Sequence, residues 1–239
     1  MKPILLLPFV LTLPLFAGTS AKQVIAPPNP CLMSWFTGAS VGYLTELEEP
    51  MYNIHLGVTN TCWVLGGWNV SGFVEVGYTT KSEDYSPRDH ETPPIYVPNR
   101  ISLDVDQMGQ ALQYAADYYN AHTSYDLDIV PITLNVKFER AISGDLSAYI
   151  GGGLGVAYVD LDLSGHSIQG PSLSASDSDW VFYSQVFGGL SYKVTPNFEV
   201  YGGARWIYMS DASFSAYGES ATLELGSDCL LELGARYKF

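Results

Sequence analysis

The sequence predicts an all-β protein, folded as an eight-stranded antiparallel up-and-down β-barrel that spans a membrane. Three observations support this prediction. Short segments that alternate apolar and polar residues recur along the chain, which is typical of β-strands. An export signal comes first, and no other apolar run is long enough for a transmembrane helix. Residues 229–239 alternate without interruption and end on the aromatic Phe239.

The first 21 residues have the pattern of a secretory signal peptide. Lys2 precedes an apolar stretch over residues 3–16, and the small residues that follow it suit a signal peptidase. We expect cleavage after Ala21. An uncleaved anchor would need roughly 20 apolar residues, and this run is shorter and contains two prolines. The predicted organisation is a signal peptide (1–21), an N-terminal periplasmic segment (22–34) and the barrel (35–239).

The composition fits a membrane barrel and argues against nucleic-acid binding. Hydrophobic residues make up 47% of the chain and charged residues 15%, with 17 Tyr, 10 Phe and 5 Trp. Acidic residues outnumber basic ones by 25 to 11, for a formal charge of −14. Removal of the signal would take away Lys2 and make the charge one unit more negative. Since binding of phosphates needs clustered Lys and Arg, we expect no nucleic-acid partner.

Eight segments are predicted as strands because apolar residues recur at every second position. In chain order, the apolar faces consist of Trp35, Thr37, Ala39, Val41 and Tyr43; Tyr52, Ile54, Leu56 and Val58; Val70, Gly72, Val74, Val76 and Tyr78; Val130, Ile132, Leu134, Val136 and Phe138; Leu146, Ala148, Ile150, Leu154, Val156 and Tyr158; Phe182, Val186, Leu190, Tyr192 and Val194; Phe198, Val200, Ala204, Trp206 and Tyr208; and Leu231, Leu233, Ala235, Tyr237 and Phe239.

The opposite faces carry charges among glycines and hydroxyl residues. Eight such faces cannot all be solvent faces of one compact two-layer domain, and the aromatic residues on the apolar faces suit a membrane interface. The pattern therefore predicts lipid outside and a polar lumen inside. The segment from Phe198 to Tyr208, at about 3.3 Å per residue and a tilt near 40°, spans roughly 25 Å, the height of an outer-membrane apolar band.

The hairpin registers support the same topology, because same-face residues must meet across an antiparallel pair. Pairing Phe138 with Ile150 centres a turn on Gly144, and pairing Val194 with Phe198 centres one on Pro196. Both are turn-forming residues. Short turns then alternate with long loops. Two features fit less well: the connection over residues 59–68 is long for a turn, and Pro131 is expected to mark a bulge because it lacks a ladder donor.

The longest loop covers about residues 81–128. Its proline-rich first part is followed by apolar residues at helical spacing, namely Met108, Leu112, Ala115, Ala116 and Tyr119. We expect a short helix over the barrel mouth, with extended hairpin strands as the alternative.

Candidate functional residues are six lumen charges: Glu75, Lys137, Glu139, Arg205, Glu232 and Arg236. Eight strands enclose little more space than side chains fill. Buried charges must pair, which favours a salt-bridge network that keeps the barrel closed. A gated ion path is the alternative.

Other chemistry is less well supported. The histidines are scattered at His55, His90, His122 and His166, and no fixed partner for a hydrolytic triad is visible. Four Asp-x-Asp pairs, at 104/106, 126/128, 160/162 and 177/179, could offer oxygen ligands to a hard cation or form a solvated acidic rim. Without a complete calcium-loop spacing, we assign no metal site.

The glycines at 151, 152, 153 and 155 are only superficially like a phosphate-binding loop, because no helix and no Lys follow them. Close packing of lumen side chains explains them better. We therefore expect no cofactor.

The chain resembles the eight-stranded outer-membrane barrels of the OmpA/OmpX type, the porin-like outer-membrane β-barrel domain of Gram-negative bacteria. The resemblance covers about residues 35–239 and rests on the C-terminal Leu-Glu-Leu-Gly-Ala-Arg-Tyr-Lys-Phe, the glycine-rich 149–158 segment and Phe-Glu-Val-Tyr-Gly-Gly-Ala-Arg-Trp at 198–206. It implies that the barrel-assembly machinery reads Leu231, Leu233, Ala235, Tyr237 and Phe239. It also implies an outer-membrane location. Some members of this family carry a periplasmic peptidoglycan-binding domain after the barrel; no such domain is expected within this sequence, so we do not expect a role in cell-wall anchoring.

The function expected from these features is structural or interactive, with a largely filled lumen and acidic external loops that meet an unknown extracellular partner. We expect a monomer surrounded by outer-membrane lipid and no enzyme activity. A small ion-conducting porin and an outer-membrane hydrolase acting on lipid are the alternatives. A soluble ligand carrier would need an apolar interior and a charged exterior, which the face assignments oppose.

A disulfide between Cys31 and Cys62 is also predicted. Pairing Leu44 with Glu49 and following the two strands downwards brings Cys31 opposite Cys62, at about 4.5 to 5.5 Å between Cβ atoms, and export exposes both to an oxidising compartment. Cys229 should remain free. Three free thiols are the alternative.

Overall fold

The computed structural model describes residues 33–87, 102–119, 121–167, 172–216 and 219–239. The predicted signal peptide and nearly all of the predicted periplasmic segment lie outside these ranges. No helix in the described ranges is long and apolar enough to cross a membrane.

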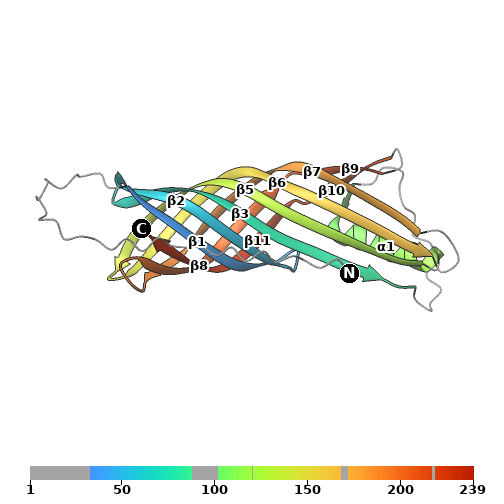
Figure 1. Cartoon of the computed structure of the whole chain (residues 1–239), viewed down its shortest axis with the longest axis horizontal. Helices are drawn as coiled ribbons and strands as arrows, with labels where there is room; N and C mark the ends of the chain where they lie inside the picture. Colours follow the sequence, from blue (N-terminus) through green and yellow to red (C-terminus); the bar gives the residue numbers. More distant parts are fainter. Residues whose placement is uncertain (1–32, 88–101, 120, 168–171, 217–218) are drawn as a thin grey trace, which may run out of the picture. The chain divides into compact units, whose positions relative to one another are not determined.

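Eight strands form a closed barrel (Figure 1). The ring order is β1-β11-β8-β7-β6-β5-β3-β2, and every neighbouring pair is antiparallel. The strands are β1 (Met33–Leu44), β2 (Pro50–Leu65), β3 (Trp68–Tyr85), β5 (Ala121–Ser143), β6 (Leu146–Ser167), β7 (Ser172–Lys193), β8 (Phe198–Met209) and β11 (Ser227–Lys238). The predicted fold class and all eight predicted strands are confirmed.

The predicted registers are also confirmed. Phe138 lies opposite Ile150, with Gly144 at a positive φ of 53° in the turn. The Val194 amide donates to the Phe198 carbonyl over 3.0 Å. Short turns at 66–67, 144–145 and 194–197 all lie at one end of the barrel, called the turn end below; the longer connections lie at the loop end.

Two sequence expectations about the strands were wrong. The connection between β2 and β3 is a two-residue turn, because β2 continues to Leu65 and both Gly66 and Gly67 adopt positive φ. The irregularity lies instead within β2, between Thr59 and Val64. Pro131 causes no bulge: the register between β3 and β5 is the same on both sides of it. Gly77 provides the space, since a Cβ there would lie 2.9 Å from Pro131 Cγ.

The long loop after β3 combines both alternatives considered for it. β3 and β5 extend further than predicted, to Tyr85 and from Ala121, and helix α1 (Val105–Tyr119) lies between them. A small sheet that was not predicted joins this loop to the β8–β11 connection. Its strands are β4 (Ser102–Asp104), β10 (Glu219–Glu224) and β9 (Ala212–Ala216), with β4 parallel to β10. We call α1, β4, β9 and β10 the cap.

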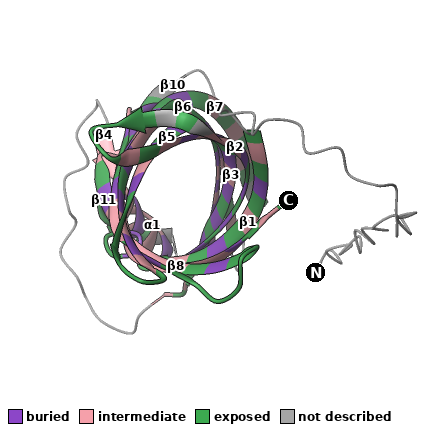
Figure 2. Cartoon of the chain, turned by 90° about the vertical axis from the view of Figure 1, so that its left-hand side faces the viewer, coloured by how far each residue is buried: buried purple, intermediate pink, exposed green. Residues whose placement is uncertain are grey.

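The outward face of the barrel is apolar over the predicted membrane band. Leu134 is 67% exposed and Leu233 71% exposed, as expected for lipid-facing residues. Aromatic side chains border the band: Trp35, Tyr192, Tyr237 and Phe239 towards the turn end, and Tyr43, Tyr52, Tyr78, Trp180, Trp206 and Tyr208 towards the loop end. Buried and exposed residues alternate along the strands (Figure 2), as expected when successive side chains face the lumen and the lipid in turn.

The strands continue past this band at the loop end, and there the pattern inverts. Tyr125, Leu127 and Ile129 of β5 are buried inside, while Asp126 and Asp128 face outwards. Met108 of α1, Phe214 of β9 and Leu223 of β10 belong to the same buried cluster. The external part is therefore built like a water-soluble protein around an apolar core, which the prediction of a uniformly polar lumen did not anticipate.

Candidate functional site: the lumen and its external mouth

The lumen within the membrane band is filled by a layer of rings and charges. Five aromatic side chains from five strands cluster there: Phe36, Phe73, Tyr149, Phe187 and Tyr201. Tyr149 is accommodated by glycines, since a Cβ at Gly189 or Gly203 would lie 2.6 Å from its hydroxyl. All six predicted lumen charges point into this layer and are less than 9% exposed.

Arg205 is the centre of the first ion-pair group. Its guanidinium binds both oxygens of Glu75, and its Nη2 lies 3.0 Å from Glu232 Oε2. Gln185 completes the group, accepting a hydrogen bond from Arg205 over 2.6 Å and donating to Glu75 over 3.1 Å. His55 Nδ1 lies 3.9 Å from Glu75. Four strands thus meet at one guanidinium, whose fixed fork suits two carboxylates.

Arg236 is the centre of a second group nearer the turn end. It pairs with Glu199 and, over 3.4 Å, with Glu139. Lys137 pairs with Glu139, and Lys238 Nζ lies 2.8 Å from Glu199. Arg236 also stacks over Phe36, with its Cζ 5.0 Å from the ring centre.

The structure brings all six predicted lumen residues together, but sequence reasoning did not name Gln185 or Glu199 as members. Both are 2% exposed or less and lie on inward faces. The alternation of the predicted strands already placed both on the polar faces, but they were not included among the predicted lumen charges. Between the two groups remains a void of about 30 Å³, room for one or two water molecules at most.

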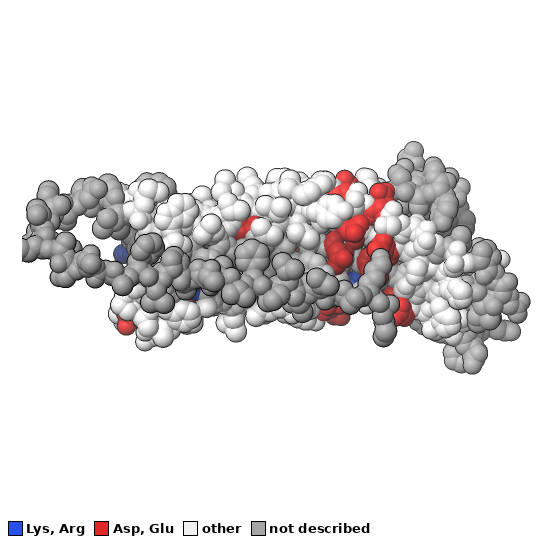
Figure 3. Space-filling model, in the orientation of Figure 1, with Lys and Arg blue, Asp and Glu red and all other residues white. Residues whose placement is uncertain are grey.

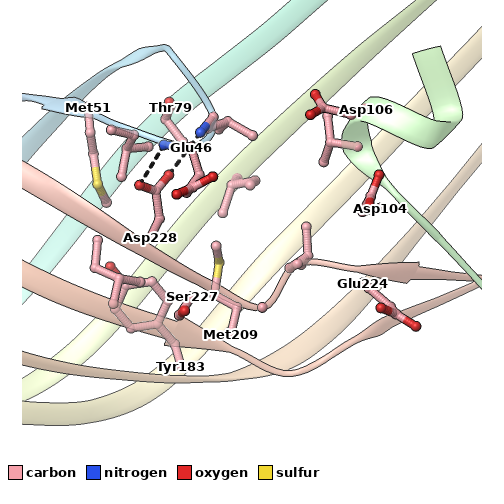
Figure 4. Close-up of a pocket in the computed structure, with 17 residues that line it drawn as sticks. Glu46, Met51, Thr79, Asp104, Asp106, Tyr183, Met209, Glu224, Ser227 and Asp228 are labelled. Atoms are coloured by element: carbon pink, nitrogen blue, oxygen red, sulfur yellow. Dashed lines mark hydrogen bonds between the residues drawn. The ribbon is translucent and has the colours of Figure 1, made fainter. Parts of the chain in front are cut away.

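A larger cavity, about 280 Å³, lies between this layer and the cap. Apolar residues of the barrel wall form its floor: Leu44, Met51, Ile129, Ile207 and Met209. Figure 4 shows Asp104, Asp106 and Glu224 on the cap side of the cavity, with Tyr183 and Met209 on the barrel wall.

Asp228 fastens the loop between β1 and β2 beside this cavity. Its carboxylate accepts hydrogen bonds from the backbone amides of Thr45, Glu46 and Leu47, over 2.9 to 3.0 Å. Figure 4 shows Asp228 below the loop that carries Glu46. Asp228 is 5% exposed. This role was not predicted, because the loop it binds is about 180 residues away in sequence.

The Asp-x-Asp pairs have different surroundings. Asp126 lies opposite Asp162, and Asp128 opposite Asp160, on the outward face beyond the aromatic border. Acidic side chains form a band on the molecular surface (Figure 3). Partial burial and the nearby carboxylates of Asp162, Asp128 and Asp177 raise the pKa of Asp160. Asp104 instead accepts a hydrogen bond from the Gln107 amide over 2.7 Å at the start of α1, a helix N-cap contact.

No group of three or more His, Cys, Asp or Glu in the described ranges could hold a metal ion. Of the histidines that the structure describes, His55 lies beside the lumen charges, whereas His122 and His166 lie at the loop end. His122 Nδ1 lies 3.1 Å from Ser86 Oγ at the loop end, where both are exposed; His166 lies opposite His122 across β5 and β6. His90 falls outside the described ranges.

The paired ladder of β1 and β2 runs to Met33 opposite Asn60, in the register used to predict the disulfide. Cys229 is a free cysteine. Cys31 lies outside the described residues, so its pairing with Cys62 stays a prediction that thiol counting on the unfolded, unreduced chain would test.

Comparison with known proteins gives the same architecture. The sequence model of a family described as surface antigen matches residues 126–227. A major outer membrane protein from Thermus thermophilus superimposes with a TM-score of 0.51 at 13% identity, covering 87% of this chain and all of the other. The chain has the fold of the outer-membrane β-barrels.

Two other similar structures are Neisserial surface protein A (12% identity, TM-score 0.44, 87% and 97% of the two chains) and the N-terminal β-barrel domain of Pseudomonas aeruginosa OprF (14% identity, TM-score 0.41, 86% and 97%). A search of curated sequences found no match. At these identities the likeness shows the fold alone, and one barrel fold can host different functions.

Proposed function

We propose that this outer-membrane barrel is a closed scaffold that presents an acidic, strand-built surface to a partner outside the cell. The observation that supports this proposal most is the layer of paired charges and rings across the lumen. It leaves a void of about 30 Å³, whereas ion passage would need a continuous water-filled path.

The form of the external part supports the same proposal. β3, β5, β6 and β7 extend past the aromatic border with an apolar core inside and aspartates outside. A rigid extension of this kind holds its outward residues in fixed positions, as a binding surface requires. The aspartates favour a partner with a basic surface, because complementary charge raises the association rate and the specificity.

The test is electrical. The full chain is reconstituted in planar lipid bilayers, and its insertion is verified by protection of the band from added protease. We expect no steady conductance. A steady current carried by small ions would contradict the closed scaffold and favour the small-porin alternative.

A lipid hydrolase is the second candidate, favoured by the Ser86–His122 contact at the rim. A nucleophile and base need a third group to orient the base and donors to stabilise an oxyanion. The described residues around this pair provide no carboxylate bound to His122. Release of fatty acid from phospholipid vesicles by the wild-type chain, lost in Ser86→Ala and in His122→Ala, would establish this activity.

A further inference from the structure

Two histidines face each other near the outer end of the barrel wall. His122 of β5 lies directly opposite His166 of β6 in the strand register. Both are exposed, and His122 follows the outward phase of its strand, since its neighbours Ala121 and Thr123 are buried. Side chains directly opposite each other on one face of an antiparallel pair have Cβ atoms about 4.5 to 5.5 Å apart. The register therefore places two imidazole side chains next to each other on the outer surface.

This arrangement suits a divalent transition-metal ion. Two nitrogens that bind one ion at about 2.0 to 2.1 Å each lie roughly 3 Å apart, and exposed His side chains can adjust their two torsions to reach that separation. Imidazole suits Cu²⁺, Ni²⁺ and Zn²⁺, whereas Mg²⁺ and Ca²⁺ prefer oxygen ligands. The ladder between β5 and β6 fixes both Cα positions, so binding needs to order only the two side chains.

Ser86 provides an independent sign that His122 is oriented as a ligand. Its Oγ lies 3.1 Å from His122 Nδ1, and its backbone carbonyl accepts a hydrogen bond from Gln113 of α1 over 3.0 Å. A His that binds a metal through one ring nitrogen nearly always donates the other ring N–H to such a group, which fixes the tautomer and the ring orientation. With Nδ1 engaged by Ser86, Nε2 of His122 is the nitrogen left for an ion.

The surroundings favour a cation. Asp126 and Asp162 lie opposite each other on the same two strands, four residues from the histidines, which is roughly 13 Å along the strands. At that distance they attract cations but cannot be ligands. Within the described parts of β5 and β6 beyond the membrane border, the outward positions carry no Lys or Arg. No three ligating side chains in the described ranges come together, so the protein supplies two ligands and water completes the coordination.

We propose that His122 and His166 form a two-ligand site for a divalent transition-metal ion, which binds Cu²⁺ most tightly. The order follows from the general preference of nitrogen ligands, which rises from Ni²⁺ to Cu²⁺ and falls again at Zn²⁺. The coordination positions held by water stay open to a further ligand from solution. This goes beyond the closed-scaffold function and does not depend on it, because the site needs only β5, β6 and Ser86.

The probes are the metal ions alone. The untagged full chain is freed of metal with a chelator and incorporated into phosphatidylcholine nanodiscs, and Cu²⁺, Ni²⁺ and Zn²⁺ are titrated by calorimetry with and without excess Ca²⁺. We expect one Cu²⁺ per chain, weaker binding of Ni²⁺ and Zn²⁺, and no competition by Ca²⁺. The electron paramagnetic resonance spectrum of bound Cu²⁺ should show coupling to two imidazole nitrogens.

Variants assign the ligands. Ser86→Ala should preserve both nitrogen couplings but weaken Cu²⁺ binding about tenfold, the usual cost of losing a group that orients a ligand. His122→Ala and His166→Ala should each leave coupling to one nitrogen and weaken Cu²⁺ binding by more than Ser86→Ala does. The double variant Asp126→Asn/Asp162→Asn is the matched control, since these acids occupy equivalent opposite positions on the same strands. It should keep both couplings and change the affinity by less than about threefold, because charges beyond about 10 Å are largely screened.

Each variant is first shown to fold by its unheated gel mobility. The proposal is overturned if the double variant His122→Ala/His166→Ala binds Cu²⁺ as tightly as the wild type, or if the wild-type spectrum shows only oxygen ligands or a single nitrogen. A loss of affinity in the aspartate control equal to that in His122→Ala would show attraction to the acidic surface only and would also overturn the site. His90 lies outside the described residues; His90→Ala should keep both couplings, and loss of one would overturn the pairing.

Discussion

Removal of the Arg205 side chain should destabilise the barrel more than any other single truncation in the lumen. Arg205 is 3% exposed and is the ion-pair partner of both Glu75 and Glu232, which are equally buried. Arg205→Met preserves most of the side-chain length but leaves two carboxylates without their cation. Loss of one partner from a buried ion pair typically costs about 3 to 5 kcal/mol, and we expect a value in this range.

The same reasoning predicts a rescue. In Arg205→Met combined with Glu75→Gln and Glu232→Gln, no uncompensated charge remains, and Gln185 can still donate to its neighbours. Replacement of complete buried ion groups by neutral side chains is often neutral or stabilising. The triple variant should therefore recover to within about 1 to 2 kcal/mol of the wild type, because the three effects are coupled and not additive.

The assay is guanidinium unfolding of the chain in lipid vesicles, followed by tryptophan fluorescence and by the mobility of unheated samples on gels. Arg140→Met is the matched control, since Arg140 is exposed near a turn, and it should change the unfolding free energy by less than about 0.5 kcal/mol. The reasoning is refuted if Arg205→Met costs less than about 1 kcal/mol, or if the triple variant is as unstable as the single one.

Three further predictions concern other parts of the barrel. Asp228→Ala should lower the unfolding free energy by about 2 to 3 kcal/mol, because the carboxylate bonds to three backbone amides, that of the buried Leu47 among them, are lost. The same assay measures it, with the exposed Asp211→Ala as control, and equal effects of the two variants would argue against the loop attachment. Leu134→Arg places a charge on the lipid face and should lower the unfolding free energy by about 2 to 4 kcal/mol, whereas Ser82→Arg, beyond the aromatic border, should lower it by about 0 to 1 kcal/mol. Equal folding yields of the two variants in lipid vesicles would contradict the assignment of Leu134 to the lipid-facing side. Because the pKa of Asp160 is raised in the folded state, the folded barrel binds a proton at Asp160 more tightly than the unfolded chain does, and the unfolding free energy should rise as pH falls from the folded pKa towards the unfolded pKa. Asp160→Asn should be more stable than the wild type at pH 7 by a few tenths of a kcal/mol and should lack this rise. An Asp160→Asn variant that is less stable at pH 7 would contradict the prediction.

Much of the membrane-spanning barrel could be predicted from the sequence, for a physical reason. Lipid and lumen impose opposite demands on alternate residues, so a segment such as Val130–Phe138 fixes its own phase and, through its partners, its register. The predicted pairs Phe138–Ile150 and Leu44–Glu49 are both present. The same alternation predicted which charged residues face the lumen.

The external part was harder because the alternation changes sign there. In β5 the apolar residues are inward up to Ile129 and outward from Val130, and the change leaves four apolar residues in succession, 129–132. Similar runs occur at 156–159 and 180–183. Such runs mark the membrane border, where each residue contacts either lipid or the core. Read in that way, they would have predicted the strand extensions.

The strands of the cap could not be predicted, because they are short and their pairing joins two distant loops. Ser102–Asp104 has no alternation to detect, and its partner β10 lies more than 100 residues further along the chain. Asp228 is similar: only the folded barrel brings its carboxylate to the amides of residues 45–47. Long-range polar contacts of this kind leave no local signal.

The central claim is that the lumen is closed, and single-channel recording on the wild-type chain and on Arg205→Ser tests it most directly. The wild type should show no steady conductance, because the two ion-pair groups and the aromatic rings fill the lumen. Arg205→Ser removes the guanidinium that joins Glu75 to Glu232 and should show intermittent small-ion currents in those molecules that insert. A wild-type barrel that conducts steadily, at the same level as the variant, would contradict the account.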